Sequence, residues 1–372
     1  MLNNYMGVIT LNENQVDIRG LTTNRPLASV PIGGRYRIID FVLSNMVNSG
    51  IVNIGIFNKN DSRSLIDHLG KGKPWDLDRK IDGLFLFNFN IANSNNSDMK
   101  ILENYMEYFH RSKQKYVIWA SSYMLCNIDL EEAAKKHEAS GKEITVIYKT
   151  VNNADKSFYN CDILNINQNN IVQSVGKNLC VEKNANISME IFIMKKETLI
   201  NLIYKCIKTG KYVTLKDSIY KNVKDINVNA YEFQGYCECI NSIKLYYKAN
   251  MDMLNLSVTE DLFNKNRPIY TKIKDEPPTK YTKNTKTSNS LIANGCIIQG
   301  TVNNSIISRN VHIHKDAVIT NCIILQSCKI HRGTKLNNVI IDKNVIVEKN
   351  TELKGTPEFP LLIEKQKTIN SH

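Results

Sequence analysis

The chain has 372 residues with an ordinary aliphatic content, so we expect two domains, because single hydrophobic cores stop growing near about 250–300 residues. No stretch approaches the roughly 20 consecutive apolar residues of a membrane span, and the N-terminus lacks the features of a signal peptide, which predicts a cytoplasmic protein without a membrane partner. The formal charge of +12 comes mostly from scattered lysines, and no RNA- or DNA-binding signature accompanies it, so we expect no nucleic acid partner.

Residues 5–11 (YMGVITL) are predicted to form a short buried strand, the usual start of an α/β domain. Gly33 and Gly34 predict a turn. Asp40 is then expected to cap a short helix that ends at Gly50, and a buried strand follows over 52–57.

Strand and helix patterns alternate from there to about residue 255. We expect helices from Asp61 or Ser62 to Gly70, and over 100–111, 128–140 and 241–254. We expect strands over 83–89, 115–122 and 142–151, a hairpin over 161–175, and a strand that enters a helix over 188–199. This alternation is typical of a mostly parallel, Rossmann-like mixed sheet with helices on both faces.

After residue 290 the pattern changes to one aliphatic residue every six positions. The residues in phase are Ile307, Ile313, Ile319, Ile324, Ile330, Leu336, Ile341, Val347 and Leu353. This step is typical of a left-handed parallel β-helix, in which each face of a triangular coil contributes one inward residue, whereas a β-sandwich would alternate at two. The segment 256–289, rich in Lys, Thr and Pro, is interpreted as a linker between domains at 1–255 and 290–372.

Two groups of side chains that could bind a metal in other contexts are predicted to have no such role. Cys237 and Cys239 have no matching Cys or His pair at zinc spacing, so reduced core thiols and no metal site are predicted. His312, His314 and His331 flank inward positions of the β-helix and are expected to point outward into solvent.

The stretch 19–51, RGLTTNRPLASVPIGGRYRIIDFVLSNMVNSGI, resembles the first nucleotide-binding segment of sugar-phosphate nucleotidyltransferases, in the form found in ADP-glucose pyrophosphorylases. The likeness includes the GKPWDLDR turn at 72–79 and extends over both domains in order. It implies a nucleotidyltransferase domain followed by a left-handed β-helix. Enzymes of this class join a sugar phosphate to a nucleoside triphosphate and release pyrophosphate, mainly by charge neutralisation and positioning.

The resemblance also implies where the catalytic groups should lie, and this chain departs from the family at each place. The glycine-rich phosphate loop falls on 12–20, where Glu13 and Asp17 would repel phosphate and Cβ atoms would block its approach. The family's Glu-Lys-Pro sugar-phosphate motif is absent. Ser188 survives from the sugar-binding Ser-Met-Gly and is the candidate remnant of that site, although Glu190 replaces the glycine.

At three further positions this chain lacks the catalytic or metal-binding residue of the family. Leu27 stands where the family has a catalytic lysine, Tyr123 lies in the turn that should carry one metal-binding acid, and Cys239 stands where the other should be. Each such group typically contributes about 10²–10³ in rate, so we expect no catalytic residue and no bound metal or cofactor in this chain. Mg²⁺ and ATP would belong to a catalytic partner.

The resemblance is therefore to the GlgD-type, non-catalytic branch of the family. It implies a regulatory subunit of glucose-1-phosphate adenylyltransferase in glycogen synthesis, which assembles with a catalytic subunit as a heterotetramer, or with itself. Arg25 and Arg37 match family arginines near a site for a phosphorylated effector, and the planar guanidinium suits phosphate. Alternatively, Arg37 pairs with Asp40 or with the domain interface and binds no effector.

Two other functions stay open at this point. The chain could be a self-sufficient but weak sugar-phosphate nucleotidyltransferase that uses unusual residues. It could also be a β-helix acyltransferase, a class that places a catalytic histidine at the interface of a trimer.

Overall fold

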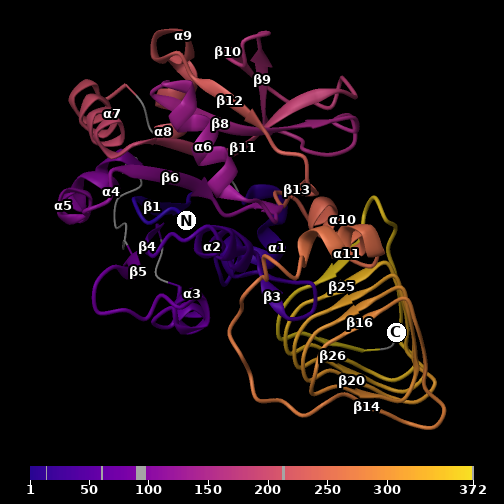
Figure 1. Cartoon of the computed structure of the whole chain (residues 1–372). Helices are drawn as coiled ribbons and strands as arrows, with labels where there is room; N and C mark the ends of the chain where they lie inside the picture. Colours follow the sequence, from indigo (N-terminus) through magenta and orange to yellow (C-terminus); the bar gives the residue numbers. More distant parts are fainter. Residues whose placement is uncertain (14, 60–61, 89–97, 212–213, 371–372) are drawn as a thin grey trace. The chain divides into compact units, whose positions relative to one another are not determined.

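A computed structural model describes residues 1–13, 15–59, 62–88, 98–211 and 214–370 (Figure 1). Contacts divide the chain into two compact units. The first unit comprises 1–13, 41–239 and 265–270, and the second unit comprises 14–40, 240–264 and 271–372. No helix within the described ranges is both long enough and apolar enough to span a membrane.

The first unit is built on a mixed sheet in the order β10-β9-β11-β6-β1-β4-β5, with β8 beside β11 and β12 beside β8. The sheet is mixed, as predicted. β1, β4, β5 and β6 pair in parallel and β12 pairs in parallel with β8, whereas β11 is antiparallel to β6, β8 and β9. The strands are β1 (Tyr5–Leu11), β4 (Asn53–Asn58), β5 (Gly83–Asn88), β6 (Tyr116–Ser121), β8 (Ile144–Val151), β9 (Asp162–Ile166), β10 (Val172–Lys177), β11 (Ala185–Lys195) and β12 (Asn229–Glu232). A separate antiparallel pair joins β7 (Met124–Cys126) to β13 (Cys237–Cys239).

Helices cover this sheet. They are α2 (Ile38–Asn48, which begins in the second unit), α3 (Arg63–Leu69), α4 (Asp98–Asn104), α5 (Met106–Arg111), α6 (Leu130–Ser140), α7 (Lys196–Thr209), α8 (Leu215–Lys221) and α9 (Val223–Ile226). Ser62 caps α3 through Leu65 N, as predicted. The helix predicted over 100–111 is instead two helices, because Tyr105 leaves helical geometry and packs its ring 4.7 Å from that of Phe87.

The second unit contains a parallel β-helix made of three sheets of short strands. The first sheet contains β14 (Lys280–Tyr281), β17 (Ile297–Ile298), β20 (His312–Ile313), β23 (Lys329–Ile330), β26 (Ile346–Val347) and β29 (Thr368–Ile369). The second contains β15 (Lys286–Ser288), β18 (Thr301–Asn303), β21 (Val318–Thr320), β24 (Lys335–Asn337) and β27 (Glu352–Lys354). The third contains β16 (Leu291–Ile292), β19 (Ile306–Ile307), β22 (Ile323–Ile324), β25 (Val339–Ile341) and β28 (Leu361–Ile363).

The six-residue step correctly predicted the interior of this coil. Eight of the nine positions are fully buried, and Leu353 in the last coil is half-buried against the same core. The corners use asparagine in the left-handed backbone region, with φ of 47° at Asn304, 52° at Asn321 and 54° at Asn338. Asparagine enters that region more readily than most residues, and Asn304 Nδ2 also donates to Asn321 Oδ1 at 2.6 Å.

The remaining elements of the second unit are short. They are η1 (Val16–Ile18), α1 (Arg19–Thr22), η2 (Leu27–Ser29), β2 (Pro31–Ile32), β3 (Tyr36–Arg37), α10 (Ile243–Asp252) and α11 (Leu256–Leu262). Gly33 and Gly34 form the predicted turn, with φ of 57° and 79°. Asp40 lies inside the first turn of α2 rather than before it, and its Oδ2 accepts a hydrogen bond from Arg37 N at 2.9 Å.

The segment 256–289, interpreted as a linker, contains α11 together with β14 and β15. These two strands pair in parallel with β17 and β18 and so form the start of the β-helix. The domain boundaries at 255 and 290 stay a prediction.

Candidate functional site

In the first unit, the position of the family's phosphate loop is occupied by a carboxylate of this chain. Glu13 follows β1, and its Oε1 accepts hydrogen bonds from Ser122 N at 2.9 Å and from Ser122 Oγ at 2.6 Å. Its Oε2 is buried and has no hydrogen-bond partner within the described part of the chain. Burial therefore raises the pKa of Glu13. The donors of the turn after β6 thus bind an internal anion.

Two buried carboxylates, Asp162 and Glu190, lie close to this carboxylate and are paired with lysines. Lys216 Nζ on α8 lies 2.5 Å from Glu190 Oε1 and 3.0 Å from Asp162 Oδ2, and Lys177 Nζ lies 2.7 Å from Asp162 Oδ1. Burial alone would lower the pKa of Lys216, but the two carboxylates outweigh burial and raise this pKa above its ordinary value. The network is internally neutralised, and we name it the ion network (Asp162, Lys177, Glu190, Lys216).

Glu190 joins the ion network from an unusual backbone position. Its φ is 52°, in the left-handed region that favours glycine, which explains why the family places glycine here. The register of β11 against β8 shifts between Ser188 and Ile191, so the strand bulges at this point. The bulge directs the Glu190 carboxylate to the Tyr123 hydroxyl, which donates to Oε1 at 2.6 Å.

Ser188, the predicted remnant of the sugar-phosphate site, is fully buried and already engaged. Its Oγ accepts a hydrogen bond from Glu190 N at 3.1 Å and contacts the Tyr220 hydroxyl. Binding a sugar phosphate through Ser188 would therefore require these internal contacts to break.

At the three positions where the resemblance predicts charged catalytic groups, the side chains are protonated or apolar. Leu27 is fully buried on η2 in the second unit. Burial, with Glu190 adding to it, raises the pKa of Tyr123 far above its ordinary value. Burial and a hydrogen bond with the Cys161 thiol do the same for Cys239 on β13.

The Mg²⁺ ion that the fold family implies does not fit these residues. Magnesium prefers anionic and neutral oxygen ligands, and neither a protonated phenol nor a protonated thiol supplies them. The carboxylates nearby are held by Ser122 and by Lys216. No group of three or more potential metal ligands was found among the residues that the structure describes.

In the second unit, both predicted effector arginines lie near lysines. Arg25 is buried, its Nε donates to Leu21 O at 2.9 Å, and its Nη2 lies 2.6 Å from Asp342 Oδ2 just after β25. Arg37 follows the turn between β2 and β3. Burial lowers the pKa values of both Lys343 and Lys274, and the charge of Arg37 lowers them further. We name this group the basic cluster (Arg25, Arg37, Lys274, Arg309, Lys343).

The five cations of the basic cluster face three carboxylates, Asp40, Glu276 and Asp342. Burial, followed by Arg37 and Arg25, lowers the pKa of Lys343 to about 7, although Asp342 opposes this shift. Burial and Arg35 lower the pKa of Arg309, whose buried Nε has no hydrogen-bond partner in the described ranges. Cations that destabilise one another in this way favour a bound anion.

The sequence alone identified some residues of the site in the first unit and some of the basic cluster. It identified Glu13, Glu190 and the two arginines because they fall on family motifs. It missed Asp162, Lys216, Lys274 and Lys343, which lie outside those motifs and whose partners are distant in the sequence. The adjacent pair Asp342-Lys343, directly after the inward Ile341, is a local signal that could have indicated a charged corner.

The three histidines of the β-helix, expected to point outward, are not part of its buried core. His312, His314 and His331 are half-buried and stack on one another, with centroid distances of 4.0 and 4.9 Å. Parallel stacking does not converge their nitrogens on one point. Burial lowers the pKa values of His312 and His314.

Comparison with known proteins gives matches to both domains. Residues 18–255 match a family model described as nucleotidyl transferase, and residues 277–358 match one described as GlmU-like, C-terminal hexapeptide. The glycogen biosynthesis protein GlgD of Bacillus subtilis (strain 168) is 37% identical over 369 residues, and that of Geobacillus stearothermophilus is 40% identical, each covering 98% of this chain and 97% of the relative. Glucose-1-phosphate adenylyltransferase of Mycoplasma mobile is 30% identical over 81% of each chain.

Proposed function

Because this chain belongs to the nucleotidyl transferase family and is a homologue of the GlgD glycogen biosynthesis proteins, we propose that it is a regulatory, catalytically inactive subunit of glucose-1-phosphate adenylyltransferase. It assembles with a catalytic subunit that converts ATP and glucose 1-phosphate to ADP-glucose and pyrophosphate. Its role is to activate that subunit in glycogen biosynthesis.

The observation that carries the proposal is that the groups needed for phosphoryl transfer are replaced by side chains that bind one another. A triphosphate needs donors and cations that are open to it, and metal ions to bridge its oxygens. Here Glu13 occupies the donors of Ser122, and Lys216 is held between two carboxylates. A triphosphate would meet the Glu13 carboxylate in place of open N–H groups.

Assembly is the route by which an inactive subunit can change catalysis. If this chain binds the active conformation of a catalytic subunit more tightly than the inactive one, it raises the active population by that difference in affinity. Similarity to GlgD proteins and, at lower identity, to glucose-1-phosphate adenylyltransferase supports a shared architecture for such an assembly. A heterotetramer is the arrangement that we propose.

The basic cluster supports a second element of the proposal, a site for a phosphorylated effector. Arg25 and Arg37 supply guanidinium groups, and the low pKa of Lys343 means that a bound anion would also drive proton uptake at this lysine near neutral pH. The pairing of Arg25 with Asp342 positions its guanidinium.

The test uses this chain with a catalytic glucose-1-phosphate adenylyltransferase that retains its loop, lysine and metal acids. We expect the two to co-elute in size-exclusion chromatography and the mixture to release pyrophosphate faster than the catalytic subunit alone. This chain alone should release none. Absence of both co-elution and activation would refute the regulatory role.

The same assay decides the alternative of a weak, self-sufficient enzyme. Magnesium-dependent pyrophosphate release by the purified chain, at a rate proportional to its concentration, would overturn the proposal of an inactive subunit.

A further inference from the structure

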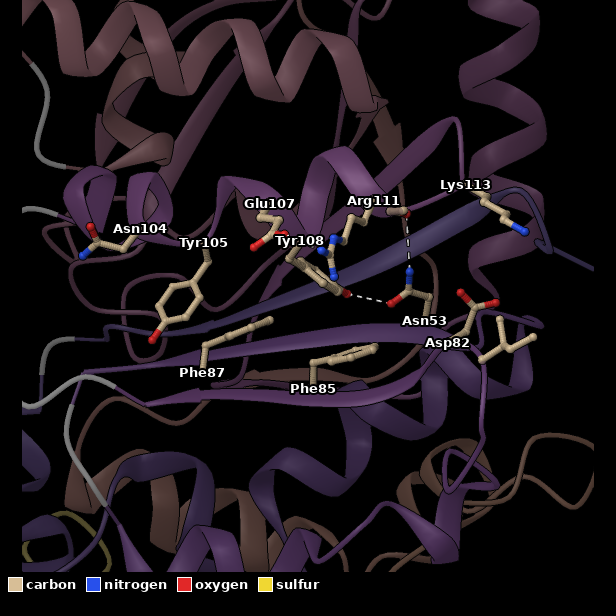
Figure 2. A pocket seen from close by; sticks show the side chains of 12 residues that line it. Asn53, Asp82, Phe85, Phe87, Asn104, Tyr105, Glu107, Tyr108, Arg111 and Lys113 are labelled. Carbon is tan, nitrogen blue, oxygen red and sulfur yellow. Dashed lines mark hydrogen bonds and ion pairs between the residues drawn. The ribbon is translucent and has the colours of Figure 1, made fainter.

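A cavity of about 430 Å³ lies in the first unit between the edge strand β5 and helix α5 (Figure 2). Its aromatic side chains come from β5, from α5 and from Tyr105 just before α5. Phe85 and Phe87 project from the same face of β5, and their rings are nearly parallel, with centroids 6.3 Å apart. Tyr105 and Tyr108 face them from the helical side, with Tyr108 5.2 Å from Phe85.

The aromatic wall of the cavity is held in place by buried hydrogen bonds. Tyr108 OH donates to Asn53 Oδ1 at 2.8 Å, and Asn53 Nδ2 donates to Gln114 Oε1 at 3.0 Å. Asn53 itself is buried. Phe85, in contrast, is 39% exposed, so part of this residue remains available to a ligand.

The rim of the cavity is polar, and its formal charges cancel. Asp82 and Glu107 are acidic, whereas Arg111 and Lys113 are basic, and Arg111 Nη2 lies 2.7 Å from Glu107 Oε1. The exposed amide of Asn104 adds both a donor and an acceptor. This balance distinguishes the cavity from the basic cluster and makes it a poor site for an anion.

We propose that this cavity binds a neutral pyranose ring of a short α-linked glucan. A pyranose has an apolar face of C–H groups that packs on flat aromatic rings, and hydroxyls at its edge that both donate and accept. The cavity offers these two surfaces together, and its volume falls in the range of small-ligand sites, about 300–1,000 Å³. The choice of an α-glucan among pyranose compounds rests on the proposed place of this chain in glycogen biosynthesis.

The experiment measures binding of maltoheptaose to the purified full chain without any catalytic subunit, by isothermal titration calorimetry and saturation-transfer NMR. We expect saturation of the sugar ring protons and an affinity that weakens by about tenfold or more in Phe85→Ala, because one stacking ring is lost. Phe85→Tyr keeps the ring and should retain binding. Phe359→Ala removes another exposed phenylalanine, 82% accessible and in the second unit, and should not change binding.

Three outcomes would overturn the proposal. They are the absence of glucan binding to the wild type, equal binding by Phe85→Ala and wild type, and displacement of the glucan by adenosine, which would mark the cavity as a site for a nucleobase. Since no catalytic subunit is present, these outcomes are independent of the activation assay. Circular dichroism of Phe85→Ala confirms that a loss of binding does not come from unfolding.

Discussion

Replacing Lys343 by methionine tests whether the basic cluster is electrostatically strained without an anion. Methionine keeps most of the aliphatic volume of lysine and removes the charge. In the folded chain, burial and the neighbouring Arg37 and Arg25 lower the pKa of Lys343 from 10.5 to about 7. The unfolded chain restores the ordinary value, so the native state binds this proton more weakly than the unfolded state does.

Proton linkage gives the sign and size of the effect. Below pH 7 the ammonium is charged in both states, and the native state carries the whole penalty, at most about 5 kcal/mol at roughly 1.4 kcal/mol per pH unit. As pH rises above 7, the native amine becomes neutral while the unfolded one stays charged, so stability increases by about 2 kcal/mol by pH 9. Lys343→Met should therefore stabilise the protein, and most strongly below pH 7.

Urea denaturation at pH 6, 7 and 9 measures this difference. Lys349→Met is the matched control, because Lys349 is an exposed lysine on the same β-helix. Inorganic pyrophosphate should stabilise the wild type more than Lys343→Met at pH 6, since the anion neutralises the ammonium. The reasoning is refuted if Lys343→Met leaves stability at pH 6 unchanged, or if both variants share one pH profile.

Three further substitutions test other parts of the molecule. Lys216→Met should lower the free energy of unfolding by about 3–5 kcal/mol, because it leaves the buried Glu190 carboxylate without a cation and Asp162 with Lys177 alone. Loss of the exposed Lys177 should cost less than about 1 kcal/mol, and equal losses in urea denaturation would contradict the ion network. Ile330→Ala should cost about 2–5 kcal/mol by calorimetry, and a negligible change would mean that this position does not face the core of the coil. Glu13→Gln should raise the melting temperature at pH 8 and not at pH 4. Burial raises the pKa of Glu13, so the charged carboxylate destabilises the folded state above that pKa. A lower melting temperature of the variant at pH 8 would contradict this reasoning.

The parts of the fold that depend on a regular period could be predicted from the sequence. The six-residue step identified the inward residues of the β-helix because every coil repeats the same geometry. The break between α4 and α5 could not be predicted this way. It depends on the contact of Tyr105 with Phe87, and the helical pattern of 100–111 contains no proline or glycine that would mark it.

The candidate sites were predictable only where a family motif fixed a position. Sequence reasoning identified Glu13 as a residue that would repel phosphate, but not that it binds Ser122, which lies 109 positions away. Likewise Lys216 and Asp162 neutralise each other in an ion pair, although no local spacing in the sequence relates the two residues. Long-range pairs of this kind are set by how strands and helices pack, and a single sequence does not encode them as a pattern.

The β-helix has a consequence for how motion is distributed in the second unit. Each coil pairs only with the coil before it and the coil after it, as β20 does with β17 and β23. A stack of this kind opens by fraying from its ends, so backbone amides of the central coils should exchange with solvent most slowly. A partner subunit bound to the last coil would therefore slow amide exchange in coils it does not touch, and hydrogen exchange along the stack would show how far from the contact its influence extends.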